Sequence, residues 1–346
     1  MTTVGALSVG GGPAAASAGD GNFRLTDPRI TESSGLAASR AHRHTVWTVN
    51  DSGDSARVFA VDTRTGDTVG VHTFDAPVQD VEALAIGPDG RMFVGDIGDN
   101  DESRPLVRVF WFDEPPLGQT RGSWASWEFA YPDGPHDAEA LLVDPRSGRL
   151  SIVTKDEPGA VYAAPDRPSR SGVNRLTRVA TAPPVVTDGV VLADGRVALR
   201  GYLRLGLYAA DTWELLSERP LPLQPQGETI AAAPGGESVF VGSEGVGSVV
   251  QRVPLSLPTG TPTAGGDRPT PAPSSDATDS APSPTPSSTP AAAAPRTGPL
   301  RSPMLETRRG TGAGVVAVMV AAALAAAAGG AAWWRRRRRG LHGTPP

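Results

Sequence analysis

The chain has 346 residues and a net charge of −5, and it contains 41 glycines, 34 prolines and no cysteine. The missing cysteines exclude a disulfide framework, a thiolate metal site and a cysteine nucleophile, and the many glycines and prolines argue against a helical bundle. Residues 19–257 hold 33 acidic and 22 basic side chains, and this net charge of −11 argues against nucleic-acid binding.

Residues 1–18 carry no charged side chain and end in Ala16-Ser17-Ala18, a pattern typical of signal-peptide cleavage. The basic first region of a signal peptide is missing, and the apolar run is weak. We interpret this segment as the end of a signal peptide truncated by a start site placed too far downstream. The alternative is a plain disordered terminus.

Residues 23–257 contain five similar segments. Each predicts a strand of small residues, a tight glycine turn, a strand of β-branched or aromatic residues, a polar loop and a third strand. The segments are 40 to 57 residues apart and begin at Glu32, Glu82, Glu139, Asp188 and Glu228. Propeller blades repeat at about 40–50 residues, so the pattern predicts an all-β fold, a β-propeller.

The number of blades follows from how the ring closes. The last segment supplies three strands before a proline-rich stretch begins, and residues 23–25 precede the first inner strand. We therefore predict that residues 23–25 form the outer strand of the last blade and that the propeller has five blades. Six blades are the alternative, if the 105–136 stretch contains a further short blade.

The C-terminal part predicts a stalk and a membrane anchor. Residues 258–312 are rich in Pro, Ser, Thr and Ala, a composition typical of a disordered stalk. Residues 313–334 lack charge and would span about 33 Å as a helix, enough to cross a bilayer. Residues 335–346 begin with five arginines, which predict a cytoplasmic tail and place the propeller outside the cell. Ala294-Pro295-Arg296-Thr297-Gly298 differs from an LPxTG sorting signal at its first position, and wall sorting is a minor alternative.

Several strings within residues 27–165 resemble a known family. They are ESSGL from Glu32, NDSGD from Asn50, GDIGDN from Gly95, and the D-x-E-A strings that start at Asp80 and Asp137. Together they resemble a bacterial extracellular propeller family that is grouped with the esterase-like, phytase-like and WD-like propellers. The resemblance implies the propeller fold and leaves the chemistry open, because the activity of that family is poorly defined.

Acidic residues recur at one face of the predicted propeller. The first strand of each blade starts at the face where the antiparallel second strand ends. The five segment starts, Glu32, Glu82, Glu139, Asp188 and Glu228, are therefore candidate metal ligands at the channel mouth. The second-strand ends add the channel-face candidates Asn50, Asp51, Asp96, Asp99, Asn100, Asp156, Arg200 and Glu244.

Five carboxylates around one channel must be protonated, hydrogen-bonded or shared by a cation. Ligands that are all oxygen favour Ca²⁺ over Mg²⁺ or Mn²⁺. The structural alternative is favoured over the metal site, because strand-end Asp and Asn often cap turns, and each acid could hydrogen-bond the neighbouring blade. A catalytic pair of carboxylates is a third and weaker alternative.

Three residues are weak catalytic candidates. Lys155 is the sole lysine in the chain, and its proton affinity would shift on burial. His136 is the best general-base candidate, and Asp137 follows it at the same face.

Three functions compete. The first is a monomeric, membrane-anchored extracellular module that binds a ligand or partner through the acidic face, with Ca²⁺ as its cofactor. The second is a divalent-metal-dependent hydrolase of an ester, lactone or phosphoester. The third is a structural propeller without a small-molecule site.

Overall fold

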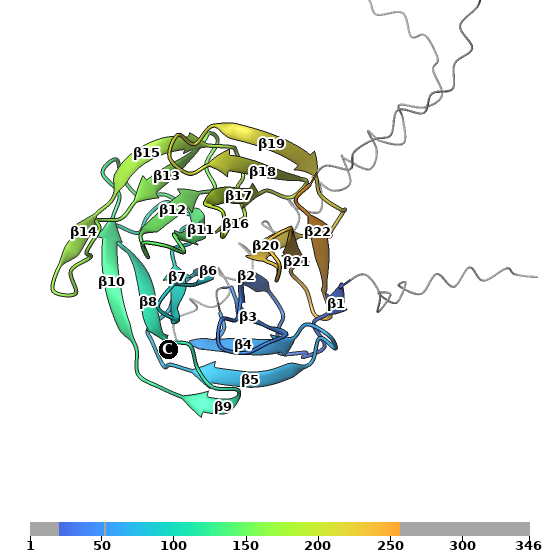
Figure 1. The fold of residues 1–346 in the computed structure, drawn as a ribbon. Helices are drawn as coiled ribbons and strands as arrows, with labels where there is room; N and C mark the ends of the chain where they lie inside the picture. The colour runs from blue at the N-terminus through green and yellow to red at the C-terminus, as the bar shows by residue number, and fades with distance from the viewer. Residues whose placement is uncertain (1–20, 52, 257–346) are drawn as a thin grey trace, which may run out of the picture. The chain divides into compact units, whose positions relative to one another are not determined.

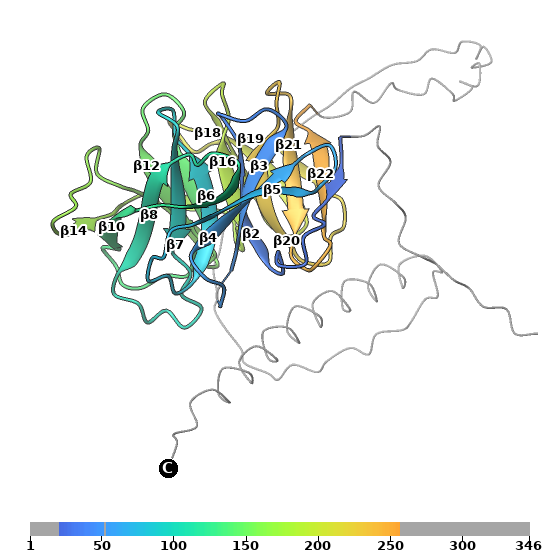
Figure 2. The ribbon, with the colours of Figure 1, turned by 90° about the horizontal axis from the view of Figure 1, so that it is seen from below.

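The computed structural model describes residues 21–51 and 53–256, where the regular structure consists of β-strands. Five sheets form a ring in which β2, β6, β11, β16 and β20 face the centre (Figure 1). Figure 2 shows the ring from the side, with the inner strands running through its thickness. The chain therefore folds as a five-bladed β-propeller. No helix in the described ranges is long and apolar enough to cross a membrane.

The blades are numbered along the chain, and their strands are given from the inside outward. Blade 1 consists of β2 (Ser33–Ala38), β3 (Thr45–Asn50), β4 (Arg57–Asp62) and β5 (Thr68–Thr73). Blade 2 consists of β6 (Val81–Ile86), β7 (Arg91–Asp96), β8 (Val107–Asp113) and β10 (Ala125–Ala130). Blade 3 consists of β11 (Ala138–Val143), β12 (Leu150–Thr154), β13 (Gly159–Ala163) and β15 (Thr177–Ala182).

Blade 4 consists of β16 (Asp188–Val191), β17 (Arg196–Arg200), β18 (Arg204–Ala209) and β19 (Leu215–Pro220). Blade 5 consists of β20 (Gly227–Ala232), β21 (Ser238–Ser243), β22 (Val249–Pro254) and β1 (Phe23–Arg24). Two further strands, β9 (Gly118–Arg121) and β14 (Val173–Arg175), pair in parallel with the outer strands β5 and β10.

The small residues of the inner strands are needed because these strands approach one another closely. A Cβ added to Gly35 in β2 would lie 2.5 Å from the backbone nitrogen of Leu84 in β6, far inside contact distance. Larger side chains on the second and third strands fill the space between blades. Each of the five blade interfaces has its own buried apolar cluster in the described residues, and Trp47 is fully enclosed in the cluster between blades 1 and 2.

The N-terminal strand closes the ring, as the sequence predicted. Phe23 in β1 pairs with Val250 in β22, so blade 5 takes its outer strand from the start of the folded chain. The six-blade alternative is wrong, because the 105–136 stretch forms β8, β9 and β10. Strands β8 and β10 belong to blade 2, and β9 extends blade 1.

Four sequence predictions lie outside the described residues. They are the truncated signal peptide at 1–18, the stalk at 258–312, the membrane helix at 313–334 and the cytoplasmic tail at 335–346. They stay predictions, as does the wall-sorting alternative.

Closure by β1 can be tested with Phe23→Ala. The Phe23 ring is buried against Phe240, with ring centroids 5.6 Å apart. Its loss should lower the free energy of unfolding by about 3–5 kcal/mol. Leu223→Ala is the control, because Leu223 is 78% exposed and its loss should change stability little. Equal melting temperatures for the two variants would contradict closure through β1.

Candidate functional site

The inner strands of four blades carry a β-bulge at the same position. The bulged residues lie within the register shifts at the start of each inner strand, and they are Ser34, Glu82, Glu139 and Glu228. A bulge adds one residue to a strand and turns its side chain away from the regular alternation. Blade 4 has a regular register here, and Asp188 pairs directly with Arg200.

This register changes the alignment of the repeats. In blade 1 the residue equivalent to Glu82 and Glu139 is Ser34, whereas Glu32 lies before β2 at the position that Asp80 and Asp137 occupy in blades 2 and 3. The signal was present in the sequence. Aligning the Gly-Leu and Ala-Leu pairs that follow each bulge would have placed Ser34 correctly.

Two of the strand-end residues are structural caps. Asn50 Oδ1 accepts the backbone N–H groups of Thr31 and Glu32 at 3.1 and 3.3 Å. Asp96 Oδ1 accepts those of Asp80 and Gln79 at 2.9 and 3.3 Å. Each side chain therefore fixes the segment that leads into the inner strand of its own blade.

Arg104 organises the GDIGDN loop, residues 95–100. Its guanidinium forms an ion pair with Asp96 at 3.0 Å and donates to the Gly98 carbonyl oxygen at 2.6 Å. Its backbone N–H donates to Asp99 Oδ2 at 2.6 Å, and the Asp99 N–H donates to Asp137 Oδ1 at 2.8 Å. Asn100 is exposed. Through these hydrogen bonds Asp99 stabilises the conformation of the loop.

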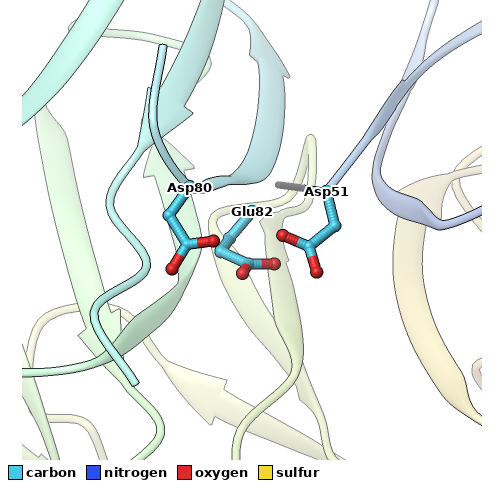
Figure 3. A group of neighbouring side chains, drawn as sticks. All are labelled: Asp51, Asp80 and Glu82. Carbon is cyan, nitrogen blue, oxygen red and sulfur yellow. The ribbon is translucent and has the colours of Figure 1, made fainter. Parts of the chain in front are cut away.

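Three carboxylates from blades 1 and 2 meet at the channel (Figure 3). Asp51, Asp80 and Glu82 each offer one oxygen, and these oxygens all lie within 4.8 Å of one another. Asp80 and Glu82 are buried, and the Ser34 hydroxyl donates to Glu82 Oε2 at 2.6 Å. We call these three residues the acidic trio.

The GDIGDN loop packs closely against two members of the acidic trio, Glu82 and Asp80, at Gly98. A Cβ at this position would lie 2.8 Å from Glu82 Oε1 and 2.9 Å from the carboxyl carbon of Asp80. A residue larger than glycine would therefore collide with the two carboxylates. Glycine at this position lets the loop backbone lie directly against them.

The other side of the channel holds Lys155. Its ammonium group lies 2.6 Å from Glu139 Oε1 and 5.8 Å from the ring centroid of Tyr202. Glu228 is buried nearby, and its Oε2 has no hydrogen-bond partner among the described residues. The channel is therefore asymmetric, with the acidic trio towards blades 1 and 2, and Lys155 beside Glu139 and Glu228 towards blades 3 and 5.

Asp188 and Arg200 join blade 4 to blade 5. Asp188 accepts the backbone N–H groups of Gly189 and Ile230, both at 2.7 Å. Arg200 donates to the carbonyl oxygens of Thr229 and Gly242 at 3.0 and 2.9 Å. These contacts match the structural alternative, in which an acid at a blade start bonds the next blade.

Burial and mutual repulsion raise the pKa of several channel carboxyls. Burial raises the pKa of Glu82, and Glu139, Asp51 and Asp80 raise it further. Burial raises the pKa of Glu139 to about 8 against the opposing effect of Lys155, and that of Glu244 to about 9 with a contribution from Glu228. Burial also raises the pKa of Glu228 and Asp188, and it lowers that of Arg200 to about 10.

His136 is held by carboxylates on both sides of its ring. Nδ1 lies 2.9 Å from Asp156 and Nε2 lies 3.1 Å from Asp133, which also accepts the Tyr162 hydroxyl at 2.9 Å. Both ring nitrogens are thus engaged away from the acidic trio. The geometry gives His136 and Asp156 a clamping role between blades 2 and 3, and the general-base hypothesis for His136 stays a prediction.

Sequence reasoning missed Ser34, Gly98 and Tyr202 as channel residues. Asp80 was noted for its place two residues before Glu82, but not as a ligand. Tyr202 lies in the short connection between β17 and β18 of blade 4. It belongs to none of the repeated sequence strings, so no sequence signal pointed to it.

Comparisons with known proteins add little to this picture. The sequence matches no family model and no curated protein. One similar solved structure is a gluconolactonase from Xanthomonas campestris, with 14% identity and a TM-score of 0.41, covering 67% of this chain and 89% of that chain. That similarity is too low to transfer residues or activity, so the functional argument depends on the side chains of this chain.

The protonated carboxyls predict that stability falls with rising pH in chelator. In the unfolded chain Glu139 and Glu244 ionise near 4.5, whereas in the folded chain they keep their protons up to about 8 and 9. The folded state binds more protons between these values, so the free energy of unfolding must fall as the pH rises from about 5 to 9. Melting temperatures at several pH values measure this slope.

Glu244→Gln should flatten the slope, because the amide does not titrate. Glu237→Gln, at an exposed turn, should leave it unchanged. A melting temperature that rises from pH 5 to 9 in chelator would contradict the protonated channel.

Proposed function

We propose that the propeller is a binding module that holds a hard divalent cation, Ca²⁺ above Mg²⁺, on the acidic trio and uses it to bind an oxygen-rich ligand at the channel mouth. The observation that carries the proposal is the convergence of Asp51, Asp80 and Glu82 within 4.8 Å. Two ionised carboxylates about 4 Å apart near a protein surface repel by about 4 kcal/mol, and a shared cation removes that cost.

The residues present fit such an ion. All donors at the trio are carboxylate oxygens, which hard cations prefer, and the chain has no cysteine to favour zinc. Ser34 fixes one oxygen of Glu82, and Gly98 lets the loop lie against the side of the other. Lys155, the sole lysine of the chain, is already paired with Glu139. The cation would supply an electrophilic point that a carbonyl, hydroxyl or carboxylate oxygen of the ligand can contact.

We propose on sequence grounds that this module acts outside the cell. The support is the uncharged 313–334 segment followed by five arginines, with a proline-rich segment between it and the propeller. In that arrangement the stalk would hold the channel away from the bilayer.

The cation is tested by melting curves with and without chelator. Calcium at a hundredfold excess over Kd should stabilise the protein by about 2.7 kcal/mol, and chelator should reverse the effect. Asp80→Asn with Glu82→Gln should abolish the response, because the amides keep the shape but lose the charge. Gly98→Ala should weaken it, because the new methyl group crowds Glu82 Oε1.

Glu237→Gln serves as the matched control and should keep the full response to Ca²⁺. The structural alternative predicts the opposite pattern. The wild-type curve would then ignore chelator and Ca²⁺, and the Asp80→Asn, Glu82→Gln variant would be neutral or more stable because repulsion is relieved.

Metal-dependent hydrolysis is the second candidate, and the Glu139–Lys155 pair favours it. Glu139 is a buried carboxyl with a pKa of about 8, and its charge is felt by Glu82 of the acidic trio. A carboxyl that titrates near the working pH suits proton transfer. In that case Glu139 would accept a proton from a nucleophile, while Lys155 holds the carboxylate in place.

Assays of generic esters, lactones and phosphoesters, with and without Ca²⁺, decide this candidate. A Glu139 base predicts kcat/KM that rises with pH through about 8, and a loss of about 100-fold or more in Glu139→Gln. If no substrate class is turned over while the melting response to Ca²⁺ is intact, the hydrolase hypothesis is rejected and the binding-module hypothesis is kept.

A further inference from the structure

Two blades have their outer edges covered by a strand from the next blade. Strand β9, from blade 2, pairs in parallel with Gly70–Thr73 of β5 in blade 1. Strand β14, from blade 3, pairs in parallel with Glu128–Ala130 of β10 in blade 2. Figure 1 shows β9 and β14 outside the strands that they cover. The fold thus uses the same edge twice to accept a parallel strand.

The corresponding edge of blade 3 is uncovered in the described residues. Its sheet ends at β15, and the connection between β18 and β19 in blade 4, residues 210–214, is too short to supply a strand. Strands β9 and β14 cover the C-terminal halves of their partners. In β15 the equivalent stretch is Ala180–Ala182, which pairs on its inner side with β13.

Blade 4 also ends in an open strand, but its edge is protected. Strand β19 carries Glu218 and Arg219 and ends in Pro220, features that oppose pairing with a further strand. Arg219 also donates to the carbonyl oxygens of Pro254 and Ser256. Strand β15 carries one charge and no proline, and its Val179 is 47% exposed.

A cavity with mixed walls adjoins this edge. It has a volume of about 320 Å³. Val179, Leu142, Val191, Val197 and Trp213 form its apolar walls, and Arg149, Asp144 and Asp211 are among its polar lining residues. Peptides that add to a sheet edge gain affinity from main-chain hydrogen bonds and specificity from pockets for their side chains. The cavity is large enough for a bulky apolar side chain.

The charge around β15 differs from that of the rest of the propeller. Four exposed arginines, Arg167, Arg170, Arg175 and Arg178, lie in or just before β14 and β15, and residues 167–187 contain no acidic side chain. None of the four forms an ion pair within the described part of the chain. A basic segment on a propeller of net charge −11 complements an acidic partner.

We propose that the open edge of β15 binds an extended acidic peptide of a partner protein. The peptide adds in parallel to Ala180–Ala182, as β9 and β14 do in blades 1 and 2. It places an apolar side chain in the cavity at Val179 and Trp213, and its acidic residues face Arg175 and Arg178. This surface is separate from the channel and does not depend on a bound cation.

The test selects ligands for the full chain from a display library of random twelve-residue peptides. The selected peptides should be enriched in Asp and Glu around a large apolar residue. Arg175→Glu with Arg178→Glu should weaken their binding at least tenfold, and so should added salt. Arg40→Glu with Arg43→Glu is the matched control, because it changes the net charge equally at exposed positions of blade 1.

Hydrogen exchange then locates the peptide. Amides of Ala180–Ala182 should become protected, while those at the channel should not change. The proposal is overturned if no peptide is selected, if the selected peptides show no acidic excess, or if both arginine pairs affect binding equally. It is also overturned if Asp80→Asn with Glu82→Gln abolishes binding, because the peptide then occupies the channel.

Discussion

Repulsion among carboxylates in one narrow channel is the constraint on which the site depends. The bulges in β6, β11 and β20 place Glu82, Glu139 and Glu228 at the channel, where the surrounding blades exclude water from them. The molecule answers that repulsion in three ways. It keeps protons on several carboxyls, it inserts Lys155 beside Glu139, and it ties Asp188 to backbone N–H groups of its own strand and of blade 5. In the acidic trio, oxygens of three carboxylates lie within 4.8 Å of one another, which is why a cation is proposed there.

The remaining polar side chains at this face support the site and do not form it. Asn50 and Asp96 fix the entry to the inner strands of blades 1 and 2, and Arg104 holds the loop that carries Gly98 against Glu82. This division explains why Asp96 and Asp99, two conspicuous acids of the sequence, hold loops and are not members of the acidic trio. Their hydrogen bonds to backbone groups stabilise the loops whose positions define the channel mouth.

The two proposed surfaces differ in chemistry and in construction. The channel is built from bulged inner strands and concentrates negative charge around a space for a small ion. The edge of β15 is built from an outer strand, and it combines an open strand edge, an adjoining cavity with apolar side chains in its walls, and exposed arginines. A protein with both could hold a small ligand at its centre while its rim engages another chain, and each event can be measured without the other.

The sequence by itself determined the fold class, the five repeats and the closing role of Phe23, because alternation and turn chemistry are local and repeat along the chain. It also determined which residue types could meet at the channel face. The tertiary structure decided which of them do. A one-residue bulge made Ser34, and not Glu32, the blade 1 equivalent of Glu82, and the loop with Gly98 packs against both Asp80 and Glu82. The roles of His136 and Arg200 likewise depended on partners in other strands and blades. Register and contacts between blades join residues far apart in sequence, so no local pattern records them.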